Sequence, residues 1–259
     1  MKNRMFPGLV AALLVASSCG TLNTTRALQG GLLAAQALTL SDEQVREYVG
    51  QWIEASDKAN HVLPESDSDT KRLRRITKDL TEVDGVPLDF KVYQTAAINA
   101  FACADGSVRV YSGLMEVMTD EQILGVIGHE IGHVALKHSK KEMQNALLRS
   151  AALEGLASTS YKIARLTDSQ LGAIGSAILG AQYSKAQETE ADDYAYDFLV
   201  SHGKNPWCLA MAFEKLKIYT EGGSSAPAGS NLLSSHPDTD ARIKRVSERA
   251  AADGYKRPY

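Results

Sequence analysis

Two histidines and a glutamate, His129, Glu130 and His133, have the spacing His-Glu-x-x-His. On an α-helix, residues i and i+4 lie on the same face, so both imidazoles can reach one metal ion. Glu130 lies next to them and can reach a water on an open position of that ion. Zinc lowers the pKa of such a water to about 7, and the carboxylate can then accept its proton. This pattern is typical of zinc-dependent hydrolysis of peptide bonds.

The sequence around these residues predicts a buried helix over residues 120–138. Thr119 and Gln122 have the spacing of a capping box at its start. Apolar residues follow at Ile123, Leu124, Val126, Ile127, Ile131, Val134 and Leu136. Histidines and a glutamate are unfavourable inside such a helix without a partner, and a metal ion is the natural one. A di-iron site would need a second Glu-x-x-His pair on another helix, which the sequence does not contain.

Two histidines leave zinc without its third protein ligand. His138 is one candidate, but on a continuous helix it lies about 140° from His133, so we expect it to face solvent. An acidic segment further along the chain fits better, because Glu188 and Asp192 share one helical face. Glu188 would complete a two-histidine, one-glutamate site, and Asp192 would accept a hydrogen bond from a ligand imidazole. Glu190 is an alternative ligand by chemistry alone, and an ordinary acidic surface helix is the other interpretation.

Four segments, in this order, resemble those of a known family. They are a strand segment at residues 99–114, the metal motif at 128–133, Glu-x-x-Ala-Asp at 188–192, and a Ser-His-Pro motif at 235–243. Together they resemble the HtpX/BepA/LoiP-type gluzincin metallopeptidases, which are relatives of the CAAX prenyl endopeptidases. The likeness is greatest to periplasmic metalloprotease lipoproteins of this family. One departure is Lys185, where relatives usually have arginine.

The resemblance implies a role for each matching residue. His129, His133 and Glu188 would bind one Zn²⁺, Glu130 would be the general base, and Asp192 would support a ligand histidine. Aligning the chain on Ala191 and Asp192 favours Glu188 over Glu190 as the ligand.

His236 is a further histidine with two open interpretations. It follows a segment rich in glycine and serine and precedes Pro237 and a predicted helix. It would either approach the zinc, as an oxyanion stabiliser or an inhibitory ligand, or anchor the last helix by hydrogen bonds. Arg242 would hydrogen-bond the active-site helix or the substrate.

The N-terminus reads as a signal peptide of the lipoprotein type over residues 1–18, followed by a tether over residues 19–40. Lys2 and Arg4 precede an apolar run that is too short to span a bilayer. Cys19 stands in a sequence that resembles a lipobox, which implies an acylated, palmitate-bearing cysteine, and Gly20 resembles the pattern of outer-membrane lipoproteins. Cleavage by ordinary signal peptidase would instead leave a soluble periplasmic protein.

Residues 41–259 read as one metallopeptidase domain. Helices are expected at residues 41–60, 70–81, 120–138, 142–165, 169–201 with breaks, 206–220 and 238–251, and strands at 89–93 and 107–111. This order predicts an α+β zincin of the gluzincin type, mostly helical, with a small sheet packed on the metal helix. In that architecture an edge strand near Asn99 and Ala100 would pair with an extended substrate backbone.

Composition adds three expectations. Without residues 1–18, which contain Lys2 and Arg4, the chain keeps 26 basic and 31 acidic residues, and its formal charge of −5 argues against nucleic acid as a partner. With Cys19 acylated, Cys103 and Cys208 could form a disulfide in an oxidising compartment, or remain as two buried thiols. The small residues in 171–181 would permit close helix packing, and a gate over the active-site cleft is the alternative.

These observations predict a zinc endopeptidase at the periplasmic face of the outer membrane. The resemblance implies misfolded or misassembled cell-envelope proteins as its substrates. The alternative is a zinc-bound chaperone or assembly factor for outer-membrane proteins whose proteolysis is incidental.

Overall fold

The structure is a computed structural model that describes residues 41–142, 144–145, 168–180, 182–221, 232, 236 and 239–258. Its helices are α2 (Asp42–Ala59), α3 (Ser68–Ile76), α4 (Ser112–Val117), α5 (Asp120–Ala135), α7 (Asp168–Leu179), α8 (Lys185–Ser201), α9 (Trp207–Glu221) and α11 (Thr239–Ala252). Its strands are β1 (Glu82–Val83), β2 (Val86–Pro87), β3 (Asp89–Tyr93), β4 (Ala100–Ala102) and β5 (Ser107–Tyr111). The predicted signal peptide, the tether with Cys19 and most of the helix expected at 142–165 lie outside the described residues.

A three-stranded sheet in the order β3-β5-β4 forms the centre of the fold. β3 runs parallel to β5, with Asp89 opposite Ser107, whereas β4 runs antiparallel to β5, with Ala102 opposite Val108. The strands predicted at residues 89–93 and 107–111 are confirmed to the residue. β4 is an edge strand of this sheet, as expected for the segment near Asn99 and Ala100.

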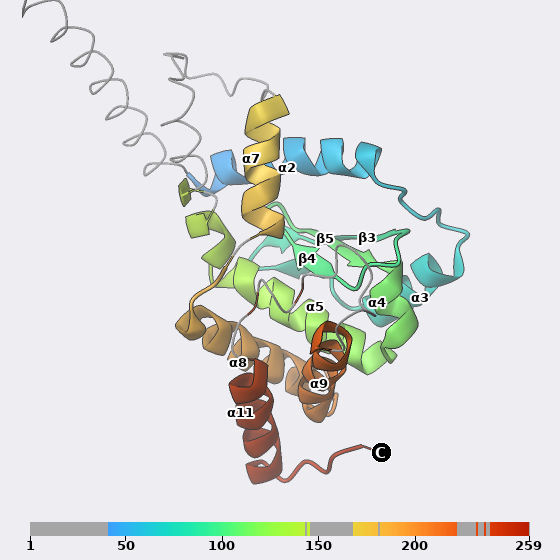
Figure 1. Cartoon of the computed structure of the whole chain (residues 1–259), viewed down its shortest axis with the longest axis vertical. Helices are drawn as coiled ribbons and strands as arrows, with labels where there is room; N and C mark the ends of the chain where they lie inside the picture. The colour runs from blue at the N-terminus through green and yellow to red at the C-terminus, as the bar shows by residue number, and fades with distance from the viewer. Residues whose placement is uncertain are drawn as a thin grey trace, which may run out of the picture.

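Helices cover both faces of this sheet. In Figure 1, α2 and α7 lie on one side, while α5 lies on the other with α8, α9 and α11 beyond it. The smaller hydrophobic core joins α2 and α7 to the sheet through side chains such as Trp52, Phe101 and Ile174. The larger core lies between the sheet, α5, α8 and α9. Among the described residues, no helix has both the length and the apolar character needed to cross a membrane.

α5 is the buried helix that carries the His-Glu-x-x-His motif. Its capping box is formed as predicted, because the Gln122 amide donates to Thr119 Oγ1 and the Gln122 side chain accepts from the Thr119 amide. Every residue from Gln122 to His133 is buried. The helix ends at Ala135, so its predicted continuation to residue 138 is wrong. Lys137 has a φ of 59°, a left-handed conformation that turns the chain.

The remaining helices follow their sequence signals with one exception. The helices expected at 41–60, 206–220 and 238–251 are confirmed to within a residue at each end, and the expected break within 169–201 lies between α7 and α8. The helix expected at 70–81 ends at Ile76, which shortens the prediction by five residues. There Thr77 caps the helix, because both its amide and its hydroxyl donate to the Leu73 carbonyl.

Two glycines allow α5 and α8 to pack closely. A Cβ at Gly128 would lie 2.7 Å from Phe198 Cδ1, and one at Gly132 would lie 3.2 Å from the Ala191 carbonyl oxygen. Because these positions lack side chains, the backbone of α8 approaches the face of α5 that carries the histidines. The acidic residues of α8 are thereby brought to the imidazoles of α5.

Candidate metal centre

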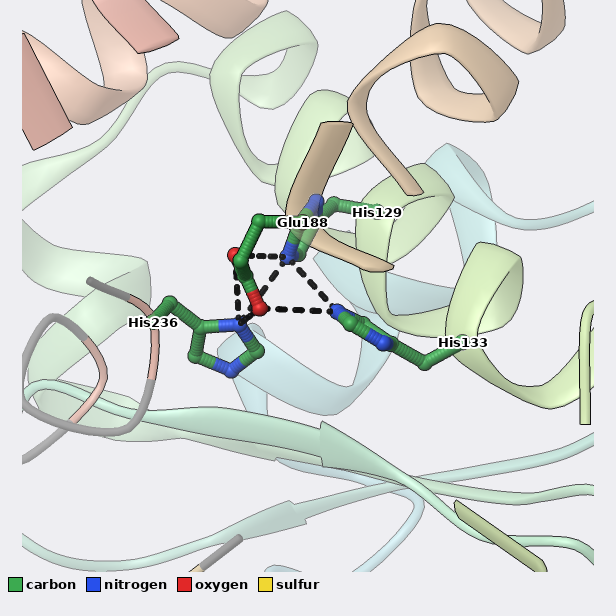
Figure 2. A group of neighbouring side chains, drawn as sticks. All are labelled: His129, His133, Glu188 and His236. Carbon is green, nitrogen blue, oxygen red and sulfur yellow. Dashed lines mark hydrogen bonds and ion pairs between the residues drawn. The ribbon is translucent and has the colours of Figure 1, made fainter. Parts of the chain in front are cut away.

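Four buried side chains converge where α5, α8 and the segment before α11 meet. His129, His133, Glu188 and His236 each offer one donor atom, and these atoms all lie within 4.8 Å of one another. Figure 2 shows the two α5 histidines side by side, with Glu188 reaching from α8 and His236 closing the group from the other side. The structure therefore brings together the three predicted ligands and the histidine whose role was left open.

The donor atoms are spaced as one metal ion requires. His129 Nε2 and His133 Nε2 are 3.1 Å apart, and Glu188 Oε1 lies 3.4 Å from His133 Nε2. His236 Nδ1 lies 3.1 Å from His129 Nε2 and 3.0 Å from Glu188 Oε1. Ligands about 2.0–2.1 Å from a tetrahedral zinc are separated from one another by roughly 3.3 Å. The donor set and its spacing thus fit zinc.

Burial favours the protonation states that bind metals. Desolvation lowers the pKa of His129 well below its ordinary value and the pKa of His133 to about 4, so both imidazoles are neutral. Burial alone would raise the pKa of Glu188, but hydrogen bonds with His133 and His236 outweigh it and lower that pKa. Neutral imidazoles and an ionised carboxylate are the forms that coordinate a metal.

Glu130 differs from the four donors. Its side chain is buried, and among the described residues its Oε1 atom has no hydrogen-bond partner. Burial raises the pKa of Glu130 to about 7. His236 Nε2 lies 3.6 Å from this oxygen, too far for a hydrogen bond, so a group that the protein does not itself supply is expected beside it. A metal-bound water is such a group.

The ion pair between Asp192 and Arg242 fixes the orientation of His129. Asp192 Oδ1 lies 3.0 Å from His129 Nδ1, so the structure places Asp192 where the sequence predicted it. Arg242 holds Asp192 through Nε and Nη2, at 2.9 and 2.7 Å, and its Nη1 lies 2.8 Å from Glu188 Oε2. Its guanidinium also stacks on Phe213 at 4.2 Å. Arg242 therefore contacts a predicted ligand and its supporting carboxylate.

The prediction that His138 faces solvent is wrong. His138 is buried, its Nδ1 lies 3.0 Å from His133 Nδ1, and its Nε2 lies 3.1 Å from Glu190 Oε2. The prediction assumed a continuous helix, whereas the turn at Lys137 returns the chain towards His133. Glu190 is not among the four clustered donors, so its alternative role as a metal ligand is not supported.

A pocket connects the cluster to the edge strand. It is lined by Asn99, Ala100, Phe101, Ala102, Glu130, Ser139, Ala177, Ile178, Leu179, Tyr183 and His236. The predicted substrate strand thus lies beside Glu130, and α7 borders the same pocket. A Cβ at Gly175 would lie 2.4 Å from Trp52 Nε1, so the small residues of α7 do permit close packing.

Sequence reasoning missed Tyr183. Its ring stacks on His133, with centroids 3.8 Å apart and planes inclined by 21°. Tyr183 precedes α8 and belongs to no periodic pattern, so nothing in the sequence marked it.

Of the two alternatives left open for Cys103 and Cys208, the structure shows two buried thiols and no disulfide. Cys103 and Cys208 are both free and buried. Cys103 packs in the smaller core near Trp52 and Phe101, whereas the Cys208 thiol donates to Glu121 in the first turn of α5. The two sulfur atoms therefore lie in different parts of the molecule.

The sequence is similar to those of a known peptidase family. The profile of Peptidase family M48 matches residues 67–250, which include the donor cluster, β4 and Arg242. The chain belongs to peptidase family M48. It is 39% identical over 257 residues to Metalloprotease LoiP of Escherichia coli (strain K12), across 99% of this chain and 100% of that protein. It is also 39% identical over 232 residues to Metalloprotease YcaL of that strain, across 89% of each.

Similarity to a third relative is lower. The chain is 27% identical over 172 residues to the Beta-barrel assembly-enhancing protease of the same strain, across 63% of this chain and 34% of that protein. The predicted family resemblance and the α+β zincin fold are confirmed, and the M48 chain is a metalloendopeptidase. Family M48 enzymes use a divalent metal, and the cluster of His129, His133, Glu188 and His236 can hold one.

Proposed function

We propose that this M48 chain is a zinc endopeptidase that hydrolyses misfolded or misassembled cell-envelope proteins. The observation that carries the proposal is the buried donor group of His129, His133 and Glu188, with Glu130 beside it, whose Oε1 atom has no hydrogen-bond partner among the described residues. Two neutral imidazoles and one carboxylate are the protein ligands of many catalytic zinc sites. One such ion per chain is expected.

Each residue has a distinct role in this proposal. When bound, zinc polarises the scissile carbonyl and acidifies the attacking water. Glu130 accepts the proton of that water and returns it to the leaving amine. Asp192 keeps the imidazole of His129 turned so that Nε2 faces the metal.

The edge strand supports a preference for unfolded substrates. β4 borders the pocket that contains Glu130, so an extended chain paired with the edge near Asn99 and Ala100 would pass the catalytic carboxylate. Pairing through the backbone tolerates many side chains. Such tolerance of side chains suits substrates that are recognised because they are unfolded. The proposed partners are polypeptides, and nucleic acid is not among them.

His236 is proposed to restrain the activity of the resting enzyme. Catalytic zinc sites keep one position open, whereas a fourth protein ligand closes the site. His236 Nδ1 lies within 3.1 Å of donor atoms of both His129 and Glu188, where a fourth ligand would lie. His236→Ala should therefore cleave casein faster while still binding zinc. Unchanged activity together with unchanged zinc affinity would leave His236 as an anchor for α11.

The cellular location is proposed from the N-terminus and the relatives. An acylated Cys19 would hold the enzyme at the periplasmic face of the outer membrane, near unfolded outer-membrane proteins. Similarity to a protein named Beta-barrel assembly-enhancing protease supports such substrates. Cys19→Ala should move the protein from the membrane fraction to the soluble fraction, and a variant that still pellets with membranes would contradict the anchor.

The first test combines metal content with cleavage. Purified residues 20–259 should contain about one zinc per chain in the natural form and in Glu130→Gln, and only the natural form should cleave casein. Glu116→Gln, at an exposed glutamate on α4, is the matched control and should cleave normally. Undiminished binding of unfolded outer-membrane proteins by Glu130→Gln, with no cleavage by either form, would favour the chaperone alternative. A folded chain that takes up no zinc would overturn the proposal.

A further inference from the structure

We infer that His138 and Glu190 form a positioning pair that holds His133 in its metal-binding tautomer. The inference rests on the proposed zinc site and adds a second line of support, separate from Asp192 and Arg242. His133 Nδ1, which faces away from the donor cluster, lies 3.0 Å from His138 Nδ1. The opposite nitrogen of His138 lies 3.1 Å from Glu190 Oε2.

Metal binding by His133 determines which ring nitrogen of His133 and of His138 carries a proton. A metal on Nε2 of His133 leaves the imidazole proton on Nδ1, which must then be a donor. His138 Nδ1 must accept that hydrogen bond, so the His138 proton lies on Nε2. This N–H group donates a hydrogen bond to the Glu190 carboxylate. In this arrangement each contact has one donor and one acceptor.

The backbone is shaped to bring His138 to this place. α5 ends at Ala135, the Lys137 amide donates to the Val134 carbonyl at 3.0 Å, and Lys137 takes a φ of 59°. A left-handed conformation is unfavourable for a non-glycine residue, so other contacts of this turn must hold it. The turn returns His138 towards α5, and the side chain of His138 is 7% exposed.

The rest of the surroundings restrict rotation of His133. Tyr183 stacks on one face of its ring at 3.8 Å, and His138 contacts its Nδ1 edge. The two ligand histidines of α5 are therefore supported differently. His129 contacts a buried carboxylate directly, whereas His133 contacts an imidazole whose carboxylate partner, Glu190, has a side chain that is 59% exposed.

Three substitutions of His138 separate hydrogen bonding from packing. In His138→Asn, Oδ1 keeps an acceptor at the position of Nδ1. In His138→Gln, the terminal amide keeps a donor towards Glu190 but the acceptor facing His133 is lost. His138→Leu removes both. His202→Leu is the control, because His202 is an exposed histidine at the end of α8, outside the metal cluster.

The readout is zinc affinity of the full chain, measured by competition with a chromophoric chelator. His138→Gln and His138→Leu should bind zinc about 10- to 100-fold more weakly, the range found for outer partners of metal ligands. Glu190→Leu, which removes the acceptor for His138 Nε2, should also bind zinc more weakly. His138→Asn, which keeps an acceptor facing His133, should stay near the natural chain, as should His202→Leu. Casein cleavage at saturating zinc should fall in the same order.

The outcomes distinguish this pair from the zinc site itself. A natural chain that binds zinc and cleaves casein, with every His138 variant equal to it, would overturn the positioning pair and leave the proposed function intact. Equal losses in Asn, Gln and Leu variants would also overturn it, because packing alone would then explain the effect. A natural chain without zinc affinity would overturn the proposed function, and the pair with it.

Discussion

Glu188 and Glu190 stand two residues apart on α8, and the structure gives them different surroundings. Glu188 is buried among the histidines, whereas Glu190 reaches His138 from the surface. Glu188→Gln should lower zinc affinity by more than about 100-fold, because it removes a ligand rather than an outer partner. Glu190→Gln is the matched control and should bind zinc nearly normally. Equal affinities in the chelator competition would contradict the assignment of Glu188.

Asp57 provides a prediction about acid stability. Burial alone would raise its pKa, but hydrogen bonds from Arg109, Lys91 and Tyr93 outweigh burial and lower the pKa from 3.8 to about 2. Arg109 lies in β5 and its side chain is fully buried, so this contact ties α2 to the sheet. A lowered folded-state pKa means that the ionised carboxylate stabilises the native state at pH values above 3.8. That contribution is lost as the pH falls towards 2.

The measurement compares chemical denaturation of the natural chain and Asp57→Asn between pH 2 and pH 6. The natural chain should be more stable by roughly 2 kcal/mol above pH 4, and the difference should shrink as the pH approaches 2. Asp79→Asn, at a carboxylate whose side chain is 74% exposed, is the control and should show little difference at any pH. A difference that grows towards pH 2 would contradict the ion pair.

At the scale of elements, the distance between α5 and α8 sets the geometry of the centre. Gly132 faces Ala191 and Tyr194 on α8, so Gly132→Val would place a branched side chain where the backbones approach. We expect it to destabilise the fold by about 1–3 kcal/mol and to weaken zinc binding, because Glu188 would move away from the histidines. Urea denaturation and chelator competition measure the two effects.

Gly172 offers the control for this substitution. It lies on α7, and a Cβ there would meet nothing within 4 Å. Gly172→Val should therefore change stability by no more than about 0.5 kcal/mol and leave zinc affinity unchanged. Similar effects at both glycines would show that helix propensity, and not the close approach of α5 and α8, governs the result.

At the scale of the whole molecule, the bound metal is expected to be a major contributor to stability. The proposed ligands come from α5 and α8, and His236 and Arg242 come from the last part of the chain. An ion present at 1,000 times its dissociation constant adds about 4 kcal/mol, which raises the Tm of a domain of this size by roughly 10 °C. Calorimetry with EDTA should show that loss, and added zinc should restore it.

Glu130→Gln is the control for the thermal experiment. It keeps all four donors and should respond to EDTA as the natural chain does. A Tm that EDTA leaves unchanged in a zinc-containing preparation would contradict the role of the metal in holding α5, α8 and the C-terminal part of the chain together.

The sequence by itself determined the features that depend on local periodicity. The spacing of His129 and His133 places both on one helical face, the capping box starts α5 at the expected residue, and alternation marks β3 and β5. The spacing of Glu188 and Asp192 likewise put both on the face of α8 that meets α5. These are regular repeats of the backbone, so residue order is enough to reveal them.

The tertiary structure alone decided the contacts that depend on turns and on distant segments. Because Lys137 has a left-handed backbone conformation, His138 contacts His133 and does not face solvent. No periodic pattern in the sequence predicts such a turn. Packing between residues far apart in the chain also decided two other features. It keeps Cys103 and Cys208 as separate free thiols, and it brings Arg242 into ion pairs with Asp192 and Glu188. Helical and strand periods carry no information about those distances, so three-dimensional packing had to supply it.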